Sequence, residues 1–131
     1  MGRLTRALVD TSPLLRTTPN LRSYGPGWAM SVVTVGELEA GVLLAHDPSV
    51  RAFRLGRLTQ YVAEALVLPV NRAVSGCYAE LRAATGRRPS NDLWIAATAL
   101  AHGLRLVTAD KRQAALPLVD AVYVGDDAEE T

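Results

Sequence analysis

The sequence predicts an α/β sandwich with a largely parallel central sheet. Short apolar runs alternate along the chain with longer segments whose apolar residues recur at helical spacing, which is typical of strand–helix–strand units. The composition allows a buried core, because 49% of the 131 residues are apolar. We find no internal repeat and no linker long enough to divide the chain, so we expect a single domain over residues 1–131.

Five apolar runs have the character of buried strands. They cover residues 7–9, 29–33, 66–70, 104–107 and 121–124. The stretch between the first two runs, residues 11–27, is punctuated by Pro and Gly and predicts only a short helix. The acidic end, residues 125–131, is expected to fray.

Four segments between the runs have helical spacing. They cover residues 34–45, 49–65, 71–85 and 91–102. Thr34 and Glu37 have the spacing of a capping box at the start of the first segment. Ser90 is the expected N-cap of the last one, and Gly86 and Gly103 follow the ends of the third and fourth. The second segment carries a broad apolar face, formed by Val50, Phe53, Leu58, Tyr61, Val62 and Ala65.

Composition excludes several classes of protein. Cys77 is the only cysteine, so neither an intramolecular disulfide nor a cysteine-based zinc site can form. No stretch approaches the roughly 18 apolar residues that span a bilayer, and no signal peptide is evident. We therefore expect a soluble, cytoplasmic protein without a membrane partner. The net charge of +1 indicates no general affinity for nucleic acid.

Two carboxylates directly follow predicted strands. Asp10 comes after the run 7–9, and Asp110 follows the run 104–107 in Val-Thr-Ala-Asp. Ligand sites in open α/β sheets collect at the carboxyl ends of the strands. The alternatives are structural: Asp10 is also suited to a turn or an N-cap, and Asp110 to capping a helix that begins at Lys111.

Two further carboxylates belong to predicted helices. Asp92 shares one helix face with an apolar stripe, which consists of Ile95, Ala96, Ala99 and Gly103. A helix N-terminus favours an acid anywhere around it, but an acid aligned with the core stripe suggests a site. Glu37 competes between two roles, because a carboxylate bound to the Thr34 amide in a capping box cannot also face a metal ion.

These acids suggest a metal site if the strands that carry them are neighbours. Carboxylates gathered at one sheet edge would repel, and a divalent cation would neutralise them. Oxygen ligands without nearby His or Cys favour Mg²⁺, with Mn²⁺ as the alternative, over zinc. A cation held by carboxylates is typical equipment for phosphodiester hydrolysis.

Three ordered motifs resemble those of the PIN-domain nucleases, and specifically of the VapC toxins. They are Leu8-Val-Asp10-Thr-Ser12, Ser31-Val-Val-Thr34-Val-Gly-Glu37-Leu-Glu-Ala-Gly41, and the stretch from Asn91-Asp92 through Ile95-Ala-Ala to Thr108-Ala-Asp110. Together they span about residues 7–112. The resemblance implies a PIN-like three-layer α/β/α sandwich and metal-dependent hydrolysis of RNA by an endoribonuclease.

The resemblance also implies roles for individual residues. Asp10 and Asp92 would be the principal metal carboxylates, and Glu37 and Asp110 would complete the pocket directly or through water. Supporting polar groups would come from Thr11 or Ser12, Thr108 and Asn91. Five cations are expected to flank the acids and to hold RNA phosphates, unless they are ordinary surface charges: Arg87, Arg88, Arg105, Lys111 and Arg112. The implied partners are a VapB-like antitoxin and a second copy in a homodimer.

The chain departs from the family pattern in three places. The segment from Asp10 to Glu37 is short, and its residues 17–20 look poorly helical, although this region usually lines the substrate groove and receives the antitoxin. The aromatic residue that often follows the last acidic motif is missing, because Lys111-Arg-Gln-Ala-Ala stands there. Gly36 should also weaken the first turn of its helix.

Two other functions remain open. A catalytically inactive binding module with the PIN fold would explain the altered loop and the missing aromatic, and it would not need Mg²⁺. A phosphatase with an aspartyl nucleophile would also be Mg²⁺-dependent, but it usually needs a second Asp two residues after the first. Position 12 is Ser12.

Overall fold

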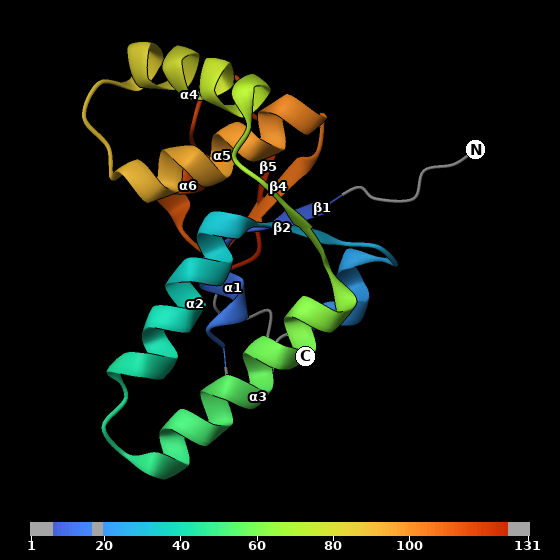
Figure 1. Cartoon of the computed structure of the whole chain (residues 1–131). Coiled ribbons are helices and arrows are strands. Elements are labelled where there is room, and N and C mark those ends of the chain that lie inside the picture. The colour runs from blue at the N-terminus through green and yellow to red at the C-terminus, as the bar shows by residue number, and fades with distance from the viewer. Residues whose placement is uncertain (1–6, 17–19, 126–131) are drawn as a thin grey trace.

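The protein is built around one five-stranded parallel sheet (Figure 1). The computed structural model describes residues 7–16 and 20–125. The strands are β1 Ala7–Val9, β2 Ala29–Ser31, β3 Leu66–Leu68, β4 Arg105–Thr108 and β5 Ala121–Tyr123, and their order in the sheet is β3-β2-β1-β4-β5. The sheet confirms the predicted α/β class.

The central position of β1 determines where the chemistry can lie. β1 pairs in parallel with β2 on one side, Leu8 opposite Ala29, and with β4 on the other, Val9 opposite Val107. Strands running in the same direction end at the same edge. The residues that follow β1, β2 and β4 are therefore brought together there.

Helices flank the sheet. They are α1 Thr11–Leu14, α2 Val32–Leu44, α3 Pro48–Glu64, α4 Arg72–Thr85, α5 Ser90–His102 and α6 Lys111–Ala114, with a 3₁₀ turn, η1, at Leu21–Tyr24. In Figure 1, α4 and α5 pack against each other, while α2 and α3 form a hairpin that projects from the body. None of the helices in the described ranges is long and apolar enough to cross a membrane.

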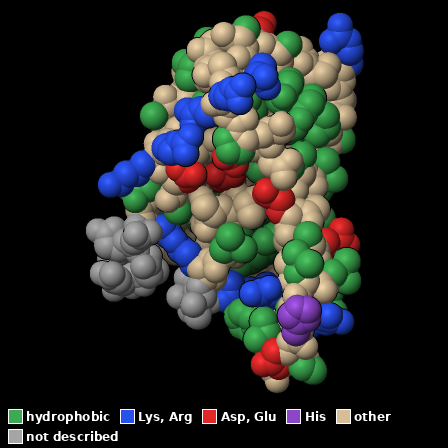
Figure 2. Space-filling view, turned by 90° about the vertical axis from the view of Figure 1, so that its left-hand side faces the viewer, with side chains coloured by type: hydrophobic (Ala, Val, Ile, Leu, Met, Phe, Trp, Pro, Cys, Tyr) green, Lys and Arg blue, Asp and Glu red, His purple; other side chains and the backbone are tan. Residues whose placement is uncertain are grey.

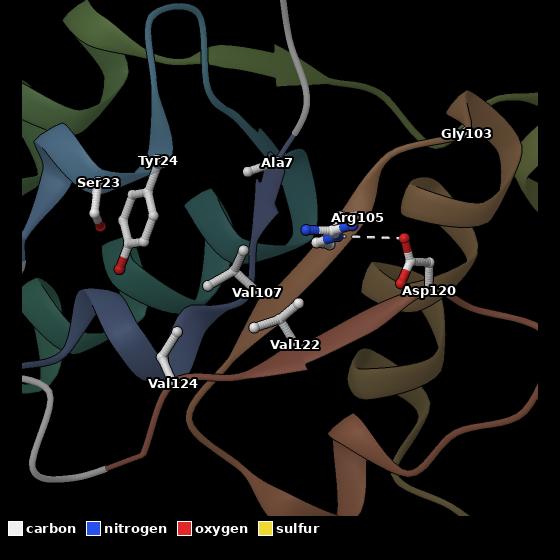
Figure 3. Close-up of a pocket in the computed structure, with 9 residues that line it drawn as sticks. All are labelled: Ala7, Ser23, Tyr24, Gly103, Arg105, Val107, Asp120, Val122 and Val124. Carbon is white, nitrogen blue, oxygen red and sulfur yellow. Dashed lines mark hydrogen bonds and ion pairs between the residues drawn. The ribbon is translucent and has the colours of Figure 1, made fainter.

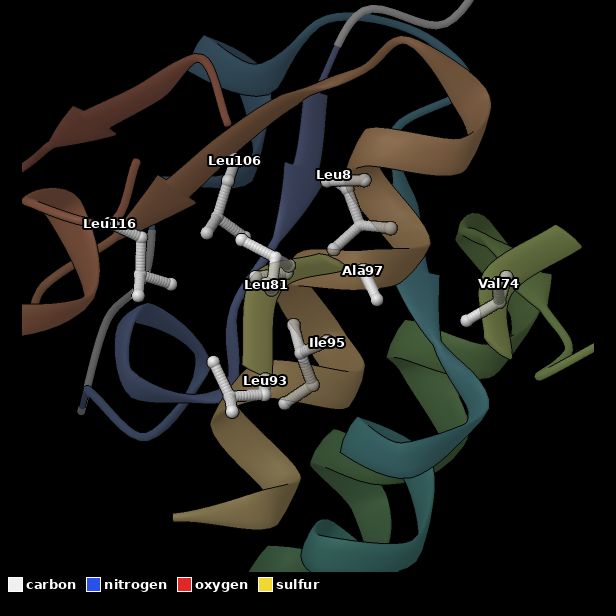
Figure 4. Close-up of a cluster of buried hydrophobic side chains, with 10 residues drawn as sticks. Leu8, Val74, Leu81, Leu93, Ile95, Ala97, Leu106 and Leu116 are labelled. Atoms are coloured by element: carbon white, nitrogen blue, oxygen red, sulfur yellow. The ribbon is translucent and has the colours of Figure 1, made fainter. Parts of the chain in front are cut away.

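Two apolar clusters hold the layers together. The larger one joins the sheet to α4 and α5 (Figure 4) and has these buried members: Leu8, Val74, Leu81, Leu93, Ile95, Ala96, Ala97, Ala99, Leu106 and Leu116. The second cluster involves alternate strand residues, Val9 and Met30, with Leu14, Trp28 and Tyr61. Because side chains alternate across a strand, Leu8 and Val9 reach opposite faces of the sheet.

The start of α2 differs from the prediction. The strand predicted over residues 29–33 ends at Ser31, and the helix begins at Val32 rather than at Thr34. Ser31 Oγ accepts a hydrogen bond from the Val33 amide at 3.0 Å, so Ser31 is the N-cap. Thr34 is fully buried within the helix. The capping-box interpretation of Thr34 and Glu37 is wrong, because Ser31 offers a hydroxyl three residues earlier.

Other helix boundaries are closer to expectation. Helix α5 begins at Ser90 itself, with Pro89 at the N-cap position and no side-chain cap, so the expected Ser90 cap is wrong. Gly103 ends α5 in the left-handed conformation, with a φ of 65°, as predicted. The segment 11–27 forms α1 and η1, rather than one short helix. Residues 17–19 and the acidic residues 126–131 lie outside the described ranges.

The predicted apolar face of α3 is only partly buried. Leu58 and Tyr61 lie in the core, whereas Phe53 is 56% exposed and Val62 is 44% exposed. The N-terminal half of α3 belongs to the projecting hairpin (Figure 1), so its apolar side chains lack a sheet to pack against. The amphipathic spacing therefore predicted the helix correctly and its burial incorrectly.

Candidate active site

Asp10 lies buried at the carboxyl edge of the sheet, where β1 meets β4. Its amide donates to the Val107 carbonyl at 2.8 Å, which extends the pairing of the two strands by one residue. Its side chain is only 4% exposed. Thr108 Oγ1, at the end of β4, donates to Asp10 Oδ2 at 2.7 Å. Two segments distant in sequence thus fix one carboxylate.

The structural interpretation of Asp10 applies to one of its two oxygens. Oδ1 accepts the Thr11 amide at 2.9 Å and caps α1, as expected of a turn residue. Burial nevertheless raises the pKa of Asp10 to about 6, because desolvation outweighs the stabilising hydrogen bonds from Thr108 and Thr11. The negative charges of Asp92 and Glu37 raise the pKa further.

Asp92 lies in the first turn of α5 and is half-buried. Its pKa is raised, first by desolvation and then by the charges of Asp110 and Glu37. Arg88 and Arg112 oppose that shift. The apolar stripe beside Asp92 is buried, as expected, since Ile95, Ala96 and Ala99 are fully inaccessible to solvent. Asp92 therefore lies within electrostatic reach of Asp110 and Glu37.

Glu37 takes no part in the cap of α2, and its charge reaches both Asp10 and Asp92. Its Oε1 accepts a hydrogen bond from Thr11 Oγ1, and its Oε2 accepts one from Asn91 Nδ2 at 3.2 Å. Thr11 Oγ1 also lies 3.0 Å from Thr34 Oγ1. These contacts join α1, α2 and the start of α5. The predicted supporting residues Thr11 and Asn91 thus contact Glu37, and Thr108 contacts Asp10.

Asp110 is the N-cap of α6, as its structural alternative predicted. Its Oδ1 accepts the Arg112 amide at 2.8 Å and the Gln113 amide at 3.4 Å. The side chain is exposed, yet its charge contributes to the raised pKa of Asp92. Asp110 therefore borders the acidic group while one of its oxygens is engaged by the helix.

Gln113 is a structural member of the site that the motifs did not reveal. It is 2% exposed, and its Nε2 donates to the Asp92 carbonyl at 2.8 Å. Asp110 and Gln113 have the spacing of a capping box, which could have drawn attention to the pair. The contact with Asp92 spans 21 residues and has no local signature. Ser12 is a second such link, because its Oγ accepts the Ala109 amide at 3.0 Å.

Four of the five predicted cations lie on elements next to the acids, but Arg105 does not flank them. Arg105 begins β4, at the end of the strand opposite to the acids, and pairs with Asp120 at 3.3 Å. Arg88 and Arg112 act on Asp92, and Lys111 lies 5.8 Å from the ring centre of Tyr123. Figure 2 shows Asp and Glu side chains gathered on one face, with Lys and Arg side chains directly above them. The expectation for Arg105 is wrong because a residue's place along its strand decides which edge it reaches.

A hollow of about 720 Å³ lies elsewhere, against the sheet face formed by β1, β4 and β5 (Figure 3). Its lining includes Tyr24, Val107 and Val122, together with the Arg105–Asp120 pair. None of the four acids lines it. We place the chemistry at the acidic edge and not in this hollow, because the perturbed carboxylates are at that edge.

The acidic edge offers oxygen ligands of the kind that hard divalent cations prefer. Asp10, Glu37, Asp92 and Asp110 are accompanied by hydroxyl and amide groups, and the buried Asp10 has a raised pKa that a nearby cation would lower. Within the described ranges, however, no three His, Cys, Asp or Glu side chains are grouped so that they could hold a metal ion together. The donor chemistry therefore fits a divalent cation held directly by few of these acids.

Comparison with known proteins identifies the family of this chain. The PIN-domain family model matches residues 7–118. Ribonuclease VapC4 of Mycobacterium tuberculosis (strain ATCC 25618 / H37Rv) is 43% identical over 129 residues, which cover 91% of this chain and 97% of that protein.

Solved structures show the same fold. VapBC-5 of Mycobacterium tuberculosis, a member of the VapBC family of toxin–antitoxin systems, matches with a TM-score of 0.77 and 32% identity, covering 93% of this chain and 100% of that one. VapBC2 of Rickettsia felis, bound to a DNA fragment from its promoter, matches with a TM-score of 0.78 at 19% identity over 92% and 98% of the two chains, which supports the fold alone. The chain belongs to the PIN-domain family and, within it, to the VapC ribonucleases.

Proposed function

We propose that this protein is a divalent-metal-dependent endoribonuclease, the toxin of a VapBC-like pair, and that Asp10, Glu37, Asp92 and Asp110 form its active site. One observation carries the proposal. Asp10 and Asp92 come from different segments that meet at the carboxyl edge of the sheet, where desolvation raises the pKa of both and the charge of Glu37 adds to both shifts. Such coupled carboxylates at a sheet edge are characteristic of functional sites rather than of structural ones.

The acids would divide the work according to their surroundings. Asp10 and Asp92 would hold the cation, since they are the most desolvated and carry the raised pKa values. Glu37 and Asp110 would act at its border, directly or through water, because both are less buried than Asp10. When bound, the divalent cation supplies Lewis-acid stabilisation of the phosphate and lowers the pKa of water. Mg²⁺ is the expected ion, with Mn²⁺ as a substitute.

Hydrogen bonds would keep these groups in place through the reaction. Thr108 and Thr11 anchor Asp10, Asn91 orients Glu37, and Gln113 fixes the backbone of Asp92. Preorganised ligands of this kind avoid the cost of rearrangement at the moment of reaction.

The attack of water on an RNA phosphodiester would take place in the cytoplasm, where the substrate is found.

The antitoxin would dock in the groove between α1, α2 and α3. This groove has a volume of about 550 Å³, and its lining includes Leu38, Val50 and Phe53 beside Arg54 and Arg57. Glu37 lines the same groove, so an occupant would reach the edge of the active site. An exposed apolar groove leading to a catalytic residue suits an inhibitory peptide segment. Homodimerisation is a further expectation from the family.

The decisive experiment is cleavage of a mixed cellular RNA pool by purified, antitoxin-free protein. Discrete fragments should appear with Mg²⁺, disappear with EDTA, and disappear with Asp92→Asn. The conservative variant Glu39→Gln, in an exposed acid on the same helix as Glu37, should keep the activity. Cleavage by Asp92→Asn at the wild-type rate would contradict the assigned site.

If the protein is instead an inactive binding module, the opposite result is expected. RNA should stay intact with either Mg²⁺ or Mn²⁺, while the folded protein still binds its partner. The phosphatase has less structural support, because Ser12 occupies the position of the second Asp and its Oγ accepts the Ala109 amide. Hydrolysis of a small phosphate monoester by wild type but not by Asp10→Asn would favour that function.

A further inference from the structure

Three arginines form a basic pocket where α4 turns into α5. A hollow of about 480 Å³ there is lined by Arg82, Arg87, Arg88 and Pro89. We propose that this arginine pocket binds backbone phosphates of the RNA strand next to the scissile bond. The proposal rests on the proposed function and extends it, because it assigns a path for the substrate that the acids alone do not define.

The pocket has the chemistry of an anion site. Three of its four lining residues are arginines, and no carboxylate lines it. In the described part of the chain, no hydrogen bond or ion pair engages the guanidinium groups of Arg82 and Arg87, and both residues are exposed. Like charges held together without a counterion repel each other. A phosphate would relieve that repulsion and would match the planar fork of the guanidinium group.

The pocket adjoins the active site through Arg88. Arg88 Nη2 donates to the Arg112 carbonyl at 3.2 Å, which ties the loop between α4 and α5 to α6. Arg88 and Arg112 both lower the pKa of Asp92, so their charges reach the acids. The same loop continues directly into α5, on which Asp92 occupies the first turn. Figure 2 shows Lys and Arg side chains immediately above the acidic group.

The charges around the site favour an RNA strand that passes from the acids onto the arginine pocket. RNA phosphates are repelled by Asp92 and Asp110 unless a cation lies between them, whereas the arginine pocket attracts the neighbouring phosphates. A strand that crosses the acids and continues over the α4–α5 loop would meet the cation first and the arginine pocket next. Arg105 cannot contribute, because it lies at the other end of β4 and is paired with Asp120.

The test uses Arg82→Ala/Arg87→Ala, with Arg105→Ala as the matched control. Arg88 is left intact because its substitution would also change the pKa of Asp92. Steady-state cleavage of a short single-stranded RNA is measured with Mg²⁺ at several NaCl concentrations. We expect the double variant to raise KM by about 10-fold at low salt, with kcat within about 2-fold of wild type.

The salt dependence provides a readout that a folding defect would not give. Loss of two phosphate contacts should make the plot of log KM against log [NaCl] shallower by about 1.4, at about 0.7 per contact for a single strand. Arg105→Ala should keep the wild-type KM and slope. Equal melting temperatures would establish that the variants are folded, and the single variant Arg87→Ala, in an exposed loop, replaces the double one if that fails to fold.

The outcomes separate this proposal from the proposed function. If wild type cleaves RNA and the double variant matches Arg105→Ala in both KM and slope, the arginine pocket does not bind the substrate. The same pattern accompanied by weaker antitoxin binding would assign the pocket to the protein partner and would also overturn the proposal. Failure of wild type to cleave any RNA contradicts the proposed function first.

Discussion

Individual residues at the acidic edge carry two roles at once. Asp10 caps α1 with one oxygen and accepts from Thr108 with the other, and Asp110 caps α6 while its charge reaches Asp92. Structural and functional interpretations of a carboxylate are therefore not exclusive, because the group has two oxygens and about four lone-pair sites. The choice between them has to be made for each oxygen.

The raised pKa of Asp10 predicts a pH-dependent stability of the metal-free protein. The native state binds the Asp10 proton more tightly than the unfolded chain does, so stability is highest below the unfolded pKa and falls as pH rises toward the native one. A rise from 3.8 to about 6 corresponds to about 3 kcal/mol, at about 1.36 kcal/mol per unit. Urea unfolding in EDTA at pH 4 and pH 7.5 measures it.

The control for this pH effect is Asp10→Asn, which cannot titrate at that position. Its free energy of unfolding should fall less than that of wild type between the same two pH values. Identical pH profiles for the two proteins would show that Asp10 is not desolvated in the way the structure indicates.

Gln113→Met tests the link to Asp92 without opening a large cavity. The substitution removes the donor to the Asp92 carbonyl, and the loss of one such hydrogen bond should lower the free energy of unfolding by about 1 kcal/mol. We also expect kcat to fall more than KM rises, because the backbone of Asp92 loses its anchor. Gln60→Met is the matched control, since Gln60 is exposed and bonds only Glu64 at the surface. Equal effects of the two substitutions would exclude a positioning role.

At the scale of elements, caps position the helices that bear the acids. Ser31 caps α2, which carries Glu37, and Asn71 caps α4, which carries none of the four acids. Both Ser31→Ala and Asn71→Ala should lower the free energy of unfolding by about 1 kcal/mol, because each leaves a first-turn amide without its acceptor. Only Ser31→Ala should also reduce RNA cleavage, measured well below the melting temperature. A matching loss in Asn71→Ala would indicate a general folding defect.

At the scale of the whole molecule, the hairpin of α2 and α3 leaves apolar side chains in solvent. Leu43 and Leu44 are each 72% exposed, and Phe53 is 56% exposed. Isolated apolar residues on a surface are ordinary, but an apolar groove lined also by Glu37, one of the proposed site residues, suggests a binding site. The hairpin therefore adds to the packed body an apolar surface that is available to a partner.

Phe53→Ser should weaken antitoxin binding without unfolding the protein. Phe53 lines the groove, and truncating an aromatic anchor at an interface commonly costs about 2 kcal/mol, or about 30-fold in affinity. Val62→Ser is the control on the same helix, because Val62 is 44% exposed and does not line the groove. Titration calorimetry with the purified cognate antitoxin gives both affinities. Equal losses in the two variants would place the antitoxin elsewhere.

The sequence by itself determined the α/β class and the approximate strands and helices, and it predicted the four acids that the fold brings to one edge of the sheet. Those features depend on local sequence, because the spacing of apolar residues, the glycines at helix ends and the short motifs each involve residues close together in the chain. The buried stripe of α5 beside Asp92 was readable for the same reason. Tertiary structure decided what depends on contacts between distant segments.

Three particular residues show where local information ends. Arg105 begins β4 and therefore lies at the edge of the sheet opposite to the acids, because β4 runs parallel to β1, a pairing that no local pattern states. The Ser31 cap freed Glu37 to accept from Asn91, 54 residues away. Gln113 lies in the stretch after Asp110 that lacks the aromatic residue of the family pattern, and its side-chain amide donates to the Asp92 carbonyl, 21 residues away. Each outcome depends on a segment that is distant in the sequence, and only the packed fold brings that segment within reach.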